Sequence, residues 1–167
     1  PMTQPRCQSS KEVQRAMAKS ERFENWTPPD VEHGELTKYN WLVQYPEGLT
    51  LGEHTDIGAF TYINARHGVK IEDGVQIGSH CSIYSVSTID EKKGAVKIGQ
   101  NACVGAHCVV MPGVTVGENA VVGAMSFVNE DIPADCMAYG VPARPVRAGR
   151  SENIRAPNNS GDSESKN

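Results

Sequence analysis

Two histidines occupy equivalent places in two similar six-residue segments. His80 lies in "IGSHCS" and His107 lies in "VGAHCV". An imidazole can accept a proton near neutral pH, so a His held beside a nucleophile can act as a general base. If the fold brings the two segments side by side, His80 and His107 form one site for proton transfer. The alternative is that both fill turn positions in which Asn would serve as well.

The remaining histidines suggest less chemistry. His67 in "NARHG" is a third candidate, as a contact for a substrate, whereas His54 is expected on the surface and His33 is expected to have no role. A catalytic metal site built from His needs a local pair plus a distant third ligand. Successive His are 21, 13, 13 and 27 residues apart. This spacing provides no local pair, so the sequence predicts no metal site.

A six-residue repeat must position these side chains. Twelve aliphatic residues recur through the chain, most of them six residues apart: Leu51, Ile57, Ile63, Ile71, Ile77, Ile83, Ile98, Val104, Val110, Val116, Val122 and Val128. Four residues after ten of them comes a second residue, usually small: Thr55, Thr61, Val75, Cys81, Ser87, Ala102, Cys108, Val114, Ala120 and Ser126. A helix repeats every 3.6 residues and a strand every two, so a period of six indicates short strands that turn a corner at a fixed interval.

The repeat predicts an all-β solenoid. Each hexad is one strand and a corner, three hexads close a triangular coil, the aliphatic residue fills the interior and the small residue fits the bend. The hexads that begin at residues 57, 77, 104 and 122 then lie on one face, and their fourth residues share one corner: Phe60, His80, His107 and Met125. His80 and His107 are therefore expected one coil apart, at about 4.8 Å.

Two interruptions of the repeat predict loops. Eight residues separate Ile63 from Ile71, and fifteen separate Ile83 from Ile98. The longer interruption predicts an extruded loop over about residues 86–97, and insertions in solenoids often map to a binding face.

The extruded loop carries charged groups that suit a polar substrate. Asp90 and Glu91 can pair with an amine or accept hydrogen bonds from hydroxyl groups, and Lys92 and Lys93 can contact a phosphate. Ser85, just before the loop, is a further candidate for a substrate contact. The alternative is a solvated, charged turn.

The ends of the chain differ from its middle. Residues 1–38 are predicted to form an extension, partly disordered, with a short helix after Ser10. Residues 39–147 form the repeat domain, and residues 148–167 are predicted to be a disordered tail. The net charge of −4, without a basic stripe, argues against nucleic acid as a partner. No apolar run approaches about 18 residues, so we predict no membrane insertion and a cytoplasmic location.

The hexads and the segment that follows them identify a family. The hexads "IGSHCS", "IGQNAC", "VGAHCV" and "VGENAV", followed by "DIPADCMAYGVPARPVR", resemble the hexapeptide-repeat acyltransferases of the left-handed parallel β-helix type over about residues 49–147. The resemblance implies a left-handed parallel β-helix, a homotrimer with active sites between neighbouring prisms, and acetyl-CoA as the acyl donor. Within the family the chain is most similar to the sugar O- and N-acetyltransferases of surface-polysaccharide and nucleotide-sugar pathways.

The resemblance also implies a site for the donor. In this family the pantetheine arm lies along a corner groove against small residues, and the matching positions are Gly105, Ala106, Gly123 and Ala124. Arg144 and Arg147 in the terminal segment would contact the CoA phosphates, since Arg makes forked contacts with phosphate. His80 or His107 would take the proton from the acceptor, and backbone N–H groups would stabilise the oxyanion.

One departure from the family leaves the base and the acceptor open. Many sugar and xenobiotic acetyltransferases of this fold carry the base as a His in the extruded loop, and this loop has none. An amine needs less help from a base than a hydroxyl does, so the missing His favours an amino sugar. The alternatives are a non-sugar acceptor such as serine or an antibiotic, a non-catalytic scaffold, and a metal-binding trimer like the γ-class carbonic anhydrases, which the His spacing argues against.

Overall fold

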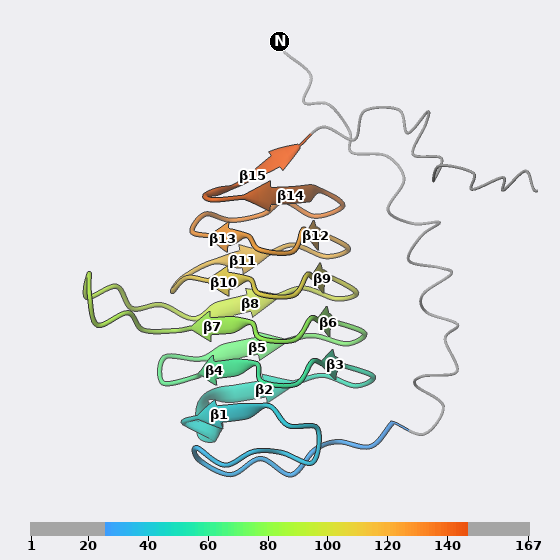
Figure 1. Cartoon of the computed structure of the whole chain (residues 1–167), viewed down its shortest axis with the longest axis vertical. Coiled ribbons are helices and arrows are strands. Elements are labelled where there is room, and N and C mark those ends of the chain that lie inside the picture. The colour runs from blue at the N-terminus through green and yellow to red at the C-terminus, as the bar shows by residue number, and fades with distance from the viewer. Residues whose placement is uncertain (1–25, 147–167) are drawn as a thin grey trace, which may run out of the picture.

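The chain folds into a three-sided prism of stacked coils in the computed structural model, which describes residues 26–146 (Figure 1). Each coil adds one short strand to each of three sheets, here named A, B and C. Sheet A contains β1 (Leu42–Gln44), β4 (Tyr62–Asn64), β7 (Ser82–Tyr84), β10 (Val109–Val110) and β13 (Phe127–Val128). Sheet B contains β2 (Leu49–Leu51), β5 (Val69–Ile71), β8 (Val96–Ile98) and β11 (Thr115–Val116). Sheet C contains β3 (Asp56–Ile57), β6 (Gln76–Ile77), β9 (Cys103–Val104), β12 (Val121–Val122), β14 (Met137–Gly140) and β15 (Ala143–Val146).

The strands pair in parallel and in register from one coil to the next. Ile57 lies opposite Ile77, and Ile77 opposite Val104, so equivalent hexad positions form straight columns. The exception is the C-terminal hairpin, in which β15 returns antiparallel to β14. The 3-10 turn η2 (Pro46–Gly48) follows β1. The predicted all-β, hexapeptide-repeat parallel β-helix is confirmed.

The aliphatic column fills the prism as the repeat predicts. Eleven of the twelve residues are buried, and Leu51 in the first coil is partly buried against the same core. Trp41, at the N-terminal end, is also buried. One inward position was predicted wrongly. Ser85 is buried, whereas Ser87 is only partly buried and lies in the extruded loop, because the insertion breaks the hexad count at this point.

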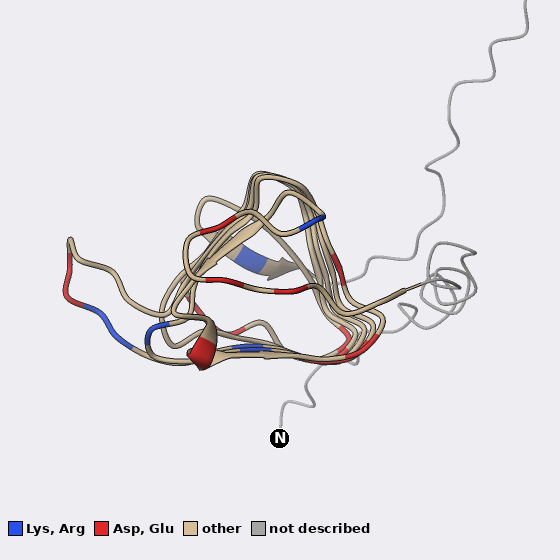
Figure 2. Ribbon diagram, turned by 90° about the horizontal axis from the view of Figure 1, so that it is seen from below, with Lys and Arg blue, Asp and Glu red and all other residues tan. Residues whose placement is uncertain are grey.

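Three corners separate the sheets, and they differ in what they carry. The corner between sheets A and B, the AB corner, carries the extruded loop, which covers residues 85–95 because Val96 and Lys97 already belong to β8. This loop projects from one corner of the triangular cross-section (Figure 2). The BC corner and the CA corner consist of tight turns. The CA corner is formed by residues 58–61, 78–81, 105–108 and 123–126.

Some of the predictions lie outside the described residues. The helix after Ser10, the tail over residues 148–167 and Arg147 all fall beyond residues 26–146. Within the described range, no helix has the length and apolar character needed to cross a membrane.

Candidate active site

The CA corner carries bulky side chains in a strained backbone conformation. The residues with positive φ there are Phe60 (63°), His80 (58°), His107 (58°) and Met125 (62°). Gly and Asn adopt this region most readily, and three of the BC turns follow that rule with Gly74, Asn101 and Asn119, whereas the first has His54 at 53°. Phe60 and Met125 are moreover 61% and 67% exposed. Strain and exposed apolar surface at one corner point to a functional site rather than a structural one.

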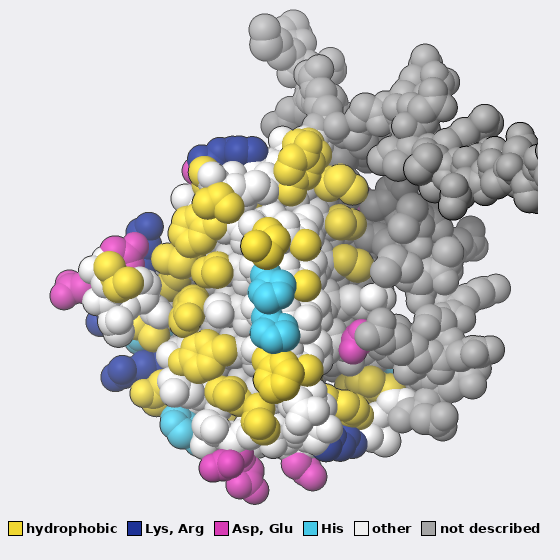
Figure 3. Space-filling view, in the orientation of Figure 1, with side chains coloured by type: hydrophobic (Ala, Val, Ile, Leu, Met, Phe, Trp, Pro, Cys, Tyr) yellow, Lys and Arg dark blue, Asp and Glu magenta, His cyan; other side chains and the backbone are white. Residues whose placement is uncertain are grey.

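His80 and His107 stack face to face on this corner. Their ring centroids are 4.8 Å apart and their planes differ by 13°. Figure 3 shows the two imidazoles in contact, within a column whose other members are hydrophobic. The ring of Phe60 continues the column, 5.2 Å from His80. The predicted juxtaposition of the two His, one coil apart, is confirmed.

Backbone hydrogen bonds hold the two His side by side. The N–H of His80 donates to the carbonyl of Ala59 at 3.0 Å, and the N–H of His107 donates to the carbonyl of Ser79 at 3.0 Å. Both side chains are exposed, so their ring nitrogens can reach an acceptor molecule. Exposed imidazoles held in this way are candidates for proton transfer.

The predicted cofactor-binding residues share the same corner. Gly105 and Ala106 directly precede His107, and Gly123 and Ala124 lie one coil further on. A Cβ added to Gly105 would lie 2.4 Å from the backbone nitrogen of Ala124. The glycines are therefore required for the stacking of the coils, whatever ligand the surface binds.

Two thiols lie beneath the His column. Cys81 and Cys108 are both buried, in the inward positions that the hexads predict. The thiol of Cys81 can donate a hydrogen bond to a thiolate at Cys108. This interaction lowers the pKa of Cys108 and raises the pKa of Cys81. Ser82 and Val109, the residues that follow the two Cys, pair in register, so the thiols are neighbours across one coil.

The extruded loop forms a short hairpin, and it does not lie beside the His pair. Val86 bridges Lys93, and the N–H of Ser87 donates to the carbonyl of Lys92 at 2.8 Å. Asp90 forms an ion pair with Lys92 at 3.3 Å. Hydrogen bonding to Ser87, together with Lys92, lowers the pKa of Asp90.

Asp90 and Glu91 thus lie on a different corner from the His pair of the same chain. The loop leaves the AB corner, whereas His80 and His107 lie at the CA corner, at the opposite ends of the sheet A strands. At the loop tip, the side chain of Ile89 is 98% exposed. One chain therefore does not assemble all of the predicted site residues in one place.

His67 and Ser85 meet at the base of the loop. The hydroxyl of Ser85 accepts the backbone N–H of His67 at 2.9 Å. Ser85 is fully buried, so the predicted substrate contact by this side chain is not supported, and its hydroxyl instead fixes the smaller insertion. His67 is exposed at the AB corner, where a ligand can reach it.

Arg144 lies on β15, at the C-terminal end of the prism. Its guanidinium forms an ion pair with Glu130 at 3.3 Å and donates to the carbonyl of Ala143 at 3.0 Å. The Arg144 side chain is half exposed, so the group is still open to a phosphate.

Comparison with known proteins identifies the family. Residues 95–130 match the sequence profile described as "Bacterial transferase hexapeptide (six repeats)". The galactoside O-acetyltransferase of Lactococcus lactis subsp. lactis (strain IL1403) is 30% identical over 156 residues, which cover 79% of this chain and 75% of that protein. The chain belongs to the hexapeptide-repeat acetyltransferase family.

A second relative and a solved structure are also similar to this chain, the first in sequence and the second in fold. The galactoside O-acetyltransferase of Escherichia coli (strain K12) is 33% identical over 123 residues, 65% of this chain, and the chain spans only 61% of that relative's length. A hexapeptide-repeat acetyltransferase of Vibrio cholerae O1 biovar eltor, solved in complex with acetyl-coenzyme A, has a TM-score of 0.62 at 22% identity, with 83% of this chain and 84% of that chain covered. The fold of the whole prism is thus shared.

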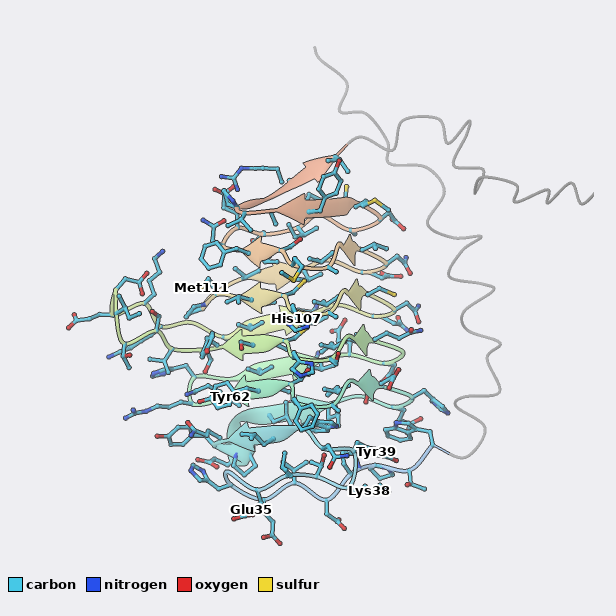
Figure 4. All side chains as sticks on the ribbon, viewed as in Figure 1. Glu35, Lys38, Tyr39, Tyr62, His107 and Met111 are labelled. Carbon is cyan, nitrogen blue, oxygen red and sulfur yellow. The ribbon has the colours of Figure 1, made fainter. Side chains whose placement is uncertain are left out.

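A polar aromatic surface on sheet A of this hexapeptide-repeat protein was not predicted. The rings of Tyr62 and Tyr84 lie 5.6 Å apart, and the Tyr62 hydroxyl donates to Oε1 of Gln44 at 2.8 Å (Figure 4). Asn64 donates its amide to the same hydroxyl at 3.4 Å. The alternation of strands β1, β4 and β7 could have revealed these outward residues, because their neighbours Val43, Ile63 and Ile83 point inward.

Residues 26–146 of the prism contain no group of three or more His, Cys, Asp or Glu side chains that could hold a metal ion.

Proposed function

We propose that this protein is an acetyl-CoA-dependent acetyltransferase whose acceptor is a sugar. The observation that carries the proposal is the stacked, exposed pair of His80 and His107 on a strained corner of the prism. The relatives named galactoside O-acetyltransferases support a sugar acceptor. The similar structure solved with acetyl-coenzyme A supports the donor.

The reaction needs one proton to leave the acceptor as it attacks. An acceptor hydroxyl or amine attacks the thioester carbonyl, and His80 or His107 takes the proton. The C–S bond then breaks, the acetyl group stays on the acceptor and CoA leaves as the thiol after regaining a proton. Backbone N–H groups along the corner groove are the oxyanion donors in this proposal.

The donor fits along the CA corner. Gly105, Ala106, Gly123 and Ala124 offer a surface of small residues against which a pantetheine arm can lie close to His107. Arg144, with Arg147 beyond the described range, would hold the CoA phosphates, in which case a phosphate competes with Glu130 for the guanidinium.

A complete site requires more than one copy of the chain. The loop that carries Asp90 and Glu91 lies at one end of the sheet A strands, and the His pair lies at the other end. A closed ring that joins the AB corner of one copy to the CA corner of the next would bring them together, because such head-to-tail contacts close by rotation. We propose a homotrimer of this kind, with the exposed Ile89 at the loop tip as one of its contacts.

The acceptor would lie between the loop and the His pair of the next copy. Asp90 and Glu91 would accept hydrogen bonds from hydroxyl groups or pair with an amine, and His67 would contribute from the loop base. Lys92 and Lys93 would meet the phosphates of a nucleotide-linked sugar. We propose an amino sugar or nucleotide-linked sugar of cytoplasmic surface-polysaccharide biosynthesis, since no His is present in the loop to assist a hydroxyl.

The test is release of free thiol from acetyl-CoA against a panel of acceptors. The panel contains amino sugars, hydroxyl sugars, their nucleotide-linked forms, and serine and an aminoglycoside as non-sugar controls. Turnover with a sugar that falls about 10²-fold or more in His80→Ala, in a chain that still folds, supports the proposal. Turnover confined to serine or the aminoglycoside contradicts the sugar acceptor, and no turnover with any acceptor contradicts the enzyme.

A further inference from the structure

A ladder of buried polar hydrogens runs inside the CA corner. Its members, here called the inner ladder, are Thr61, Cys81, Cys108 and Ser126, all 2% exposed or less. Each lies directly after one of the four positive-φ residues of the CA corner, which are Phe60, His80, His107 and Met125. The Thr61 hydroxyl donates to the carbonyl of Gly78 at 3.0 Å in the next coil. The thiols of Cys81 and Cys108 donate to the carbonyls of Gly105 and Gly123, each at 3.1 Å.

The last member of the ladder extends the same pattern to the C-terminal hairpin. The Ser126 hydroxyl donates to the carbonyl of Gly123 at 2.6 Å and accepts the N–H of Gly140 at 3.1 Å. At the lower end, Thr61 also accepts the N–H of Cys81 at 3.2 Å. The inner ladder thus links every turn of the CA corner to the next one.

The BC corner has the same backbone turns but a different interior. In three of the BC turns the buried residues in the equivalent places are Val75, Ala102 and Ala120, whose side chains carry no polar hydrogen. In the first BC turn the buried Thr55 donates to the carbonyl of Gly52 in its own turn at 3.5 Å, not to the next coil. The turns of Val75 and Ala102 hold the ordinary positive-φ residues Gly74 and Asn101. A hexad turn can therefore be built without an inner donor, so the inner ladder is not a general requirement of the fold.

The position of the ladder explains what it does at the CA corner. Cys81 follows His80 in its own turn, and its thiol fixes the carbonyl of Gly105, two residues before His107. This contact joins the turn of one imidazole to the turn of the other, in addition to the backbone hydrogen bond from His107 to Ser79. A turn that holds His at positive φ is strained, and strain persists only where the surroundings fix the backbone.

We propose that Cys81 and Cys108 are positioning residues, which hold the turns of His80 and His107 so that the two imidazoles stay stacked. For its catalytic consequence the inference rests on the proposed acetyl transfer. Its structural consequence, the stacking itself, is independent of any reaction.

The test compares three variants of the full chain. Cys81→Ala removes the donor, and Ala already occupies the equivalent inward place at Ala102 and Ala120, so the variant can fold. Cys81→Thr restores a donor, because the hydroxyl of Thr61 spans the same gap in the coil below. Val75→Ala, in the same coil at the BC corner, removes core volume without touching the CA corner and is the matched control.

Two readouts separate positioning from stability. The first is the NMR signal of the imidazole protons of His80 and His107, which stacking shifts by ring currents. The second is kcat with the best acceptor, with KM for acetyl-CoA beside it. We expect Cys81→Ala to displace both ring signals and to lower kcat about tenfold, since small displacements of reacting groups are costly. Cys81→Thr should recover the wild-type signals and rate, and Val75→Ala should lower only the melting temperature.

Wild-type ring signals in Cys81→Ala would overturn the inference, whatever happens to its melting temperature. A displacement of the ring signals as large in Val75→Ala as in Cys81→Ala would overturn it too. If the wild-type chain transfers no acetyl group, the proposed function fails. Selective loss of stacking in Cys81→Ala would still support the positioning role.

Discussion

At the scale of single residues, the CA corner has His at turn positions whose backbone conformation favours Asn. His107 has φ of 58°, which is close to the 56° of Asn101 and Asn119 at the BC corner. Asn fits this conformation at least as well as His does. Positive φ alone does not mark a chemical role, because His54 adopts it at the BC corner, and His80 and His107 differ from His54 in that they stack on each other.

His107→Asn should separate the two contributions. The turn should remain intact, so the melting temperature should stay at or above the wild-type value, whereas loss of a general base should lower kcat by about 10²-fold or more. Thermal denaturation and the thiol-release assay measure the two effects. The matched control is His54→Asn, at φ of 53° on the BC corner, which should leave kcat unchanged. A wild-type rate in His107→Asn would assign the base to His80 or to another group.

The sequence allowed the His column to be predicted but not the roles around the loop. Counting hexads was sufficient for His80 and His107, because a parallel in-register prism converts equal spacing into contact. The count fails after an insertion, which is why Ser85 and Ser87 exchanged their expected environments. The ion pair of Arg144 with Glu130 joins the terminal hairpin to the last coil. No periodicity relates those two residues.

At the scale of elements, the extruded hairpin and the prism are separable. The loop over residues 85–95 is closed by hydrogen bonds within itself, such as that from Ser87 to Lys92, and by contacts at its base. Its strands β7 and β8 are anchored by the buried Ile83 and Ile98. The boundaries predicted from sequence, about 86–97, differ by one residue at the start, because β7 ends at Tyr84, and by two at the end, because β8 begins at Val96.

Replacing residues 86–93 by a short Gly-containing turn should therefore preserve the prism and abolish transfer. Shortening a surface loop changes the closure entropy by less than about 1 kcal/mol, so the melting temperature should shift little. Activity should fall by at least about 10²-fold, because the residues that orient the acceptor are removed. Circular dichroism and the acceptor assay test the two statements. Retained activity would exclude Asp90 and Glu91 from acceptor binding.

Sheet B carries an ion-pair cluster on its outer face. Glu72 contacts the ammonium groups of Lys70 and Lys97, each at 3.1 Å, and accepts the N–H of Gln100 at 3.1 Å. The two ammonium groups, Lys70 first, lower the pKa of Glu72 below its ordinary value of 4.5. A carboxyl whose pKa is depressed by folding stabilises the native state above its unfolded pKa, and this contribution disappears as pH falls through the folded pKa.

Glu72→Gln should therefore be less stable than the wild type at neutral pH and equal to it in acid. The expected difference at neutral pH is less than about 1 kcal/mol, because the groups are partly exposed. In acid below the lowered pKa of Glu72, where the wild-type carboxyl also becomes neutral, the difference should vanish. Urea denaturation at the two pH values measures it. A difference that persists in acid would mean that the substitution disturbs packing rather than charge.

At the scale of the whole molecule, the outer faces of the prism are unequal. Sheet A presents Tyr62, Tyr84, Val109 and Phe127 outward, all partly buried, next to the exposed Phe60 and Met125 of the CA corner. Sheet B presents the charged cluster around Glu72 and the small polar residues Thr50 and Thr115. Figure 3 shows hydrophobic side chains gathered over the strands of sheet A. This asymmetry favours sheet A and the CA corner as the surface that meets a neighbouring copy.

Phe127→Glu should therefore break the proposed homotrimer, whereas Thr115→Glu on sheet B should leave it intact. Both residues are outward-facing strand residues, so each glutamate is tolerated by the isolated prism, but only the first places a charge in an apolar contact. Sedimentation velocity should give a trimer for the wild type and Thr115→Glu and smaller species for Phe127→Glu. The rate of transfer should fall with assembly, because the loop of one copy and the His pair of the next then separate. If Phe127→Glu remains trimeric and active, a different face forms the interface, and the loop must reach its acceptor from another direction.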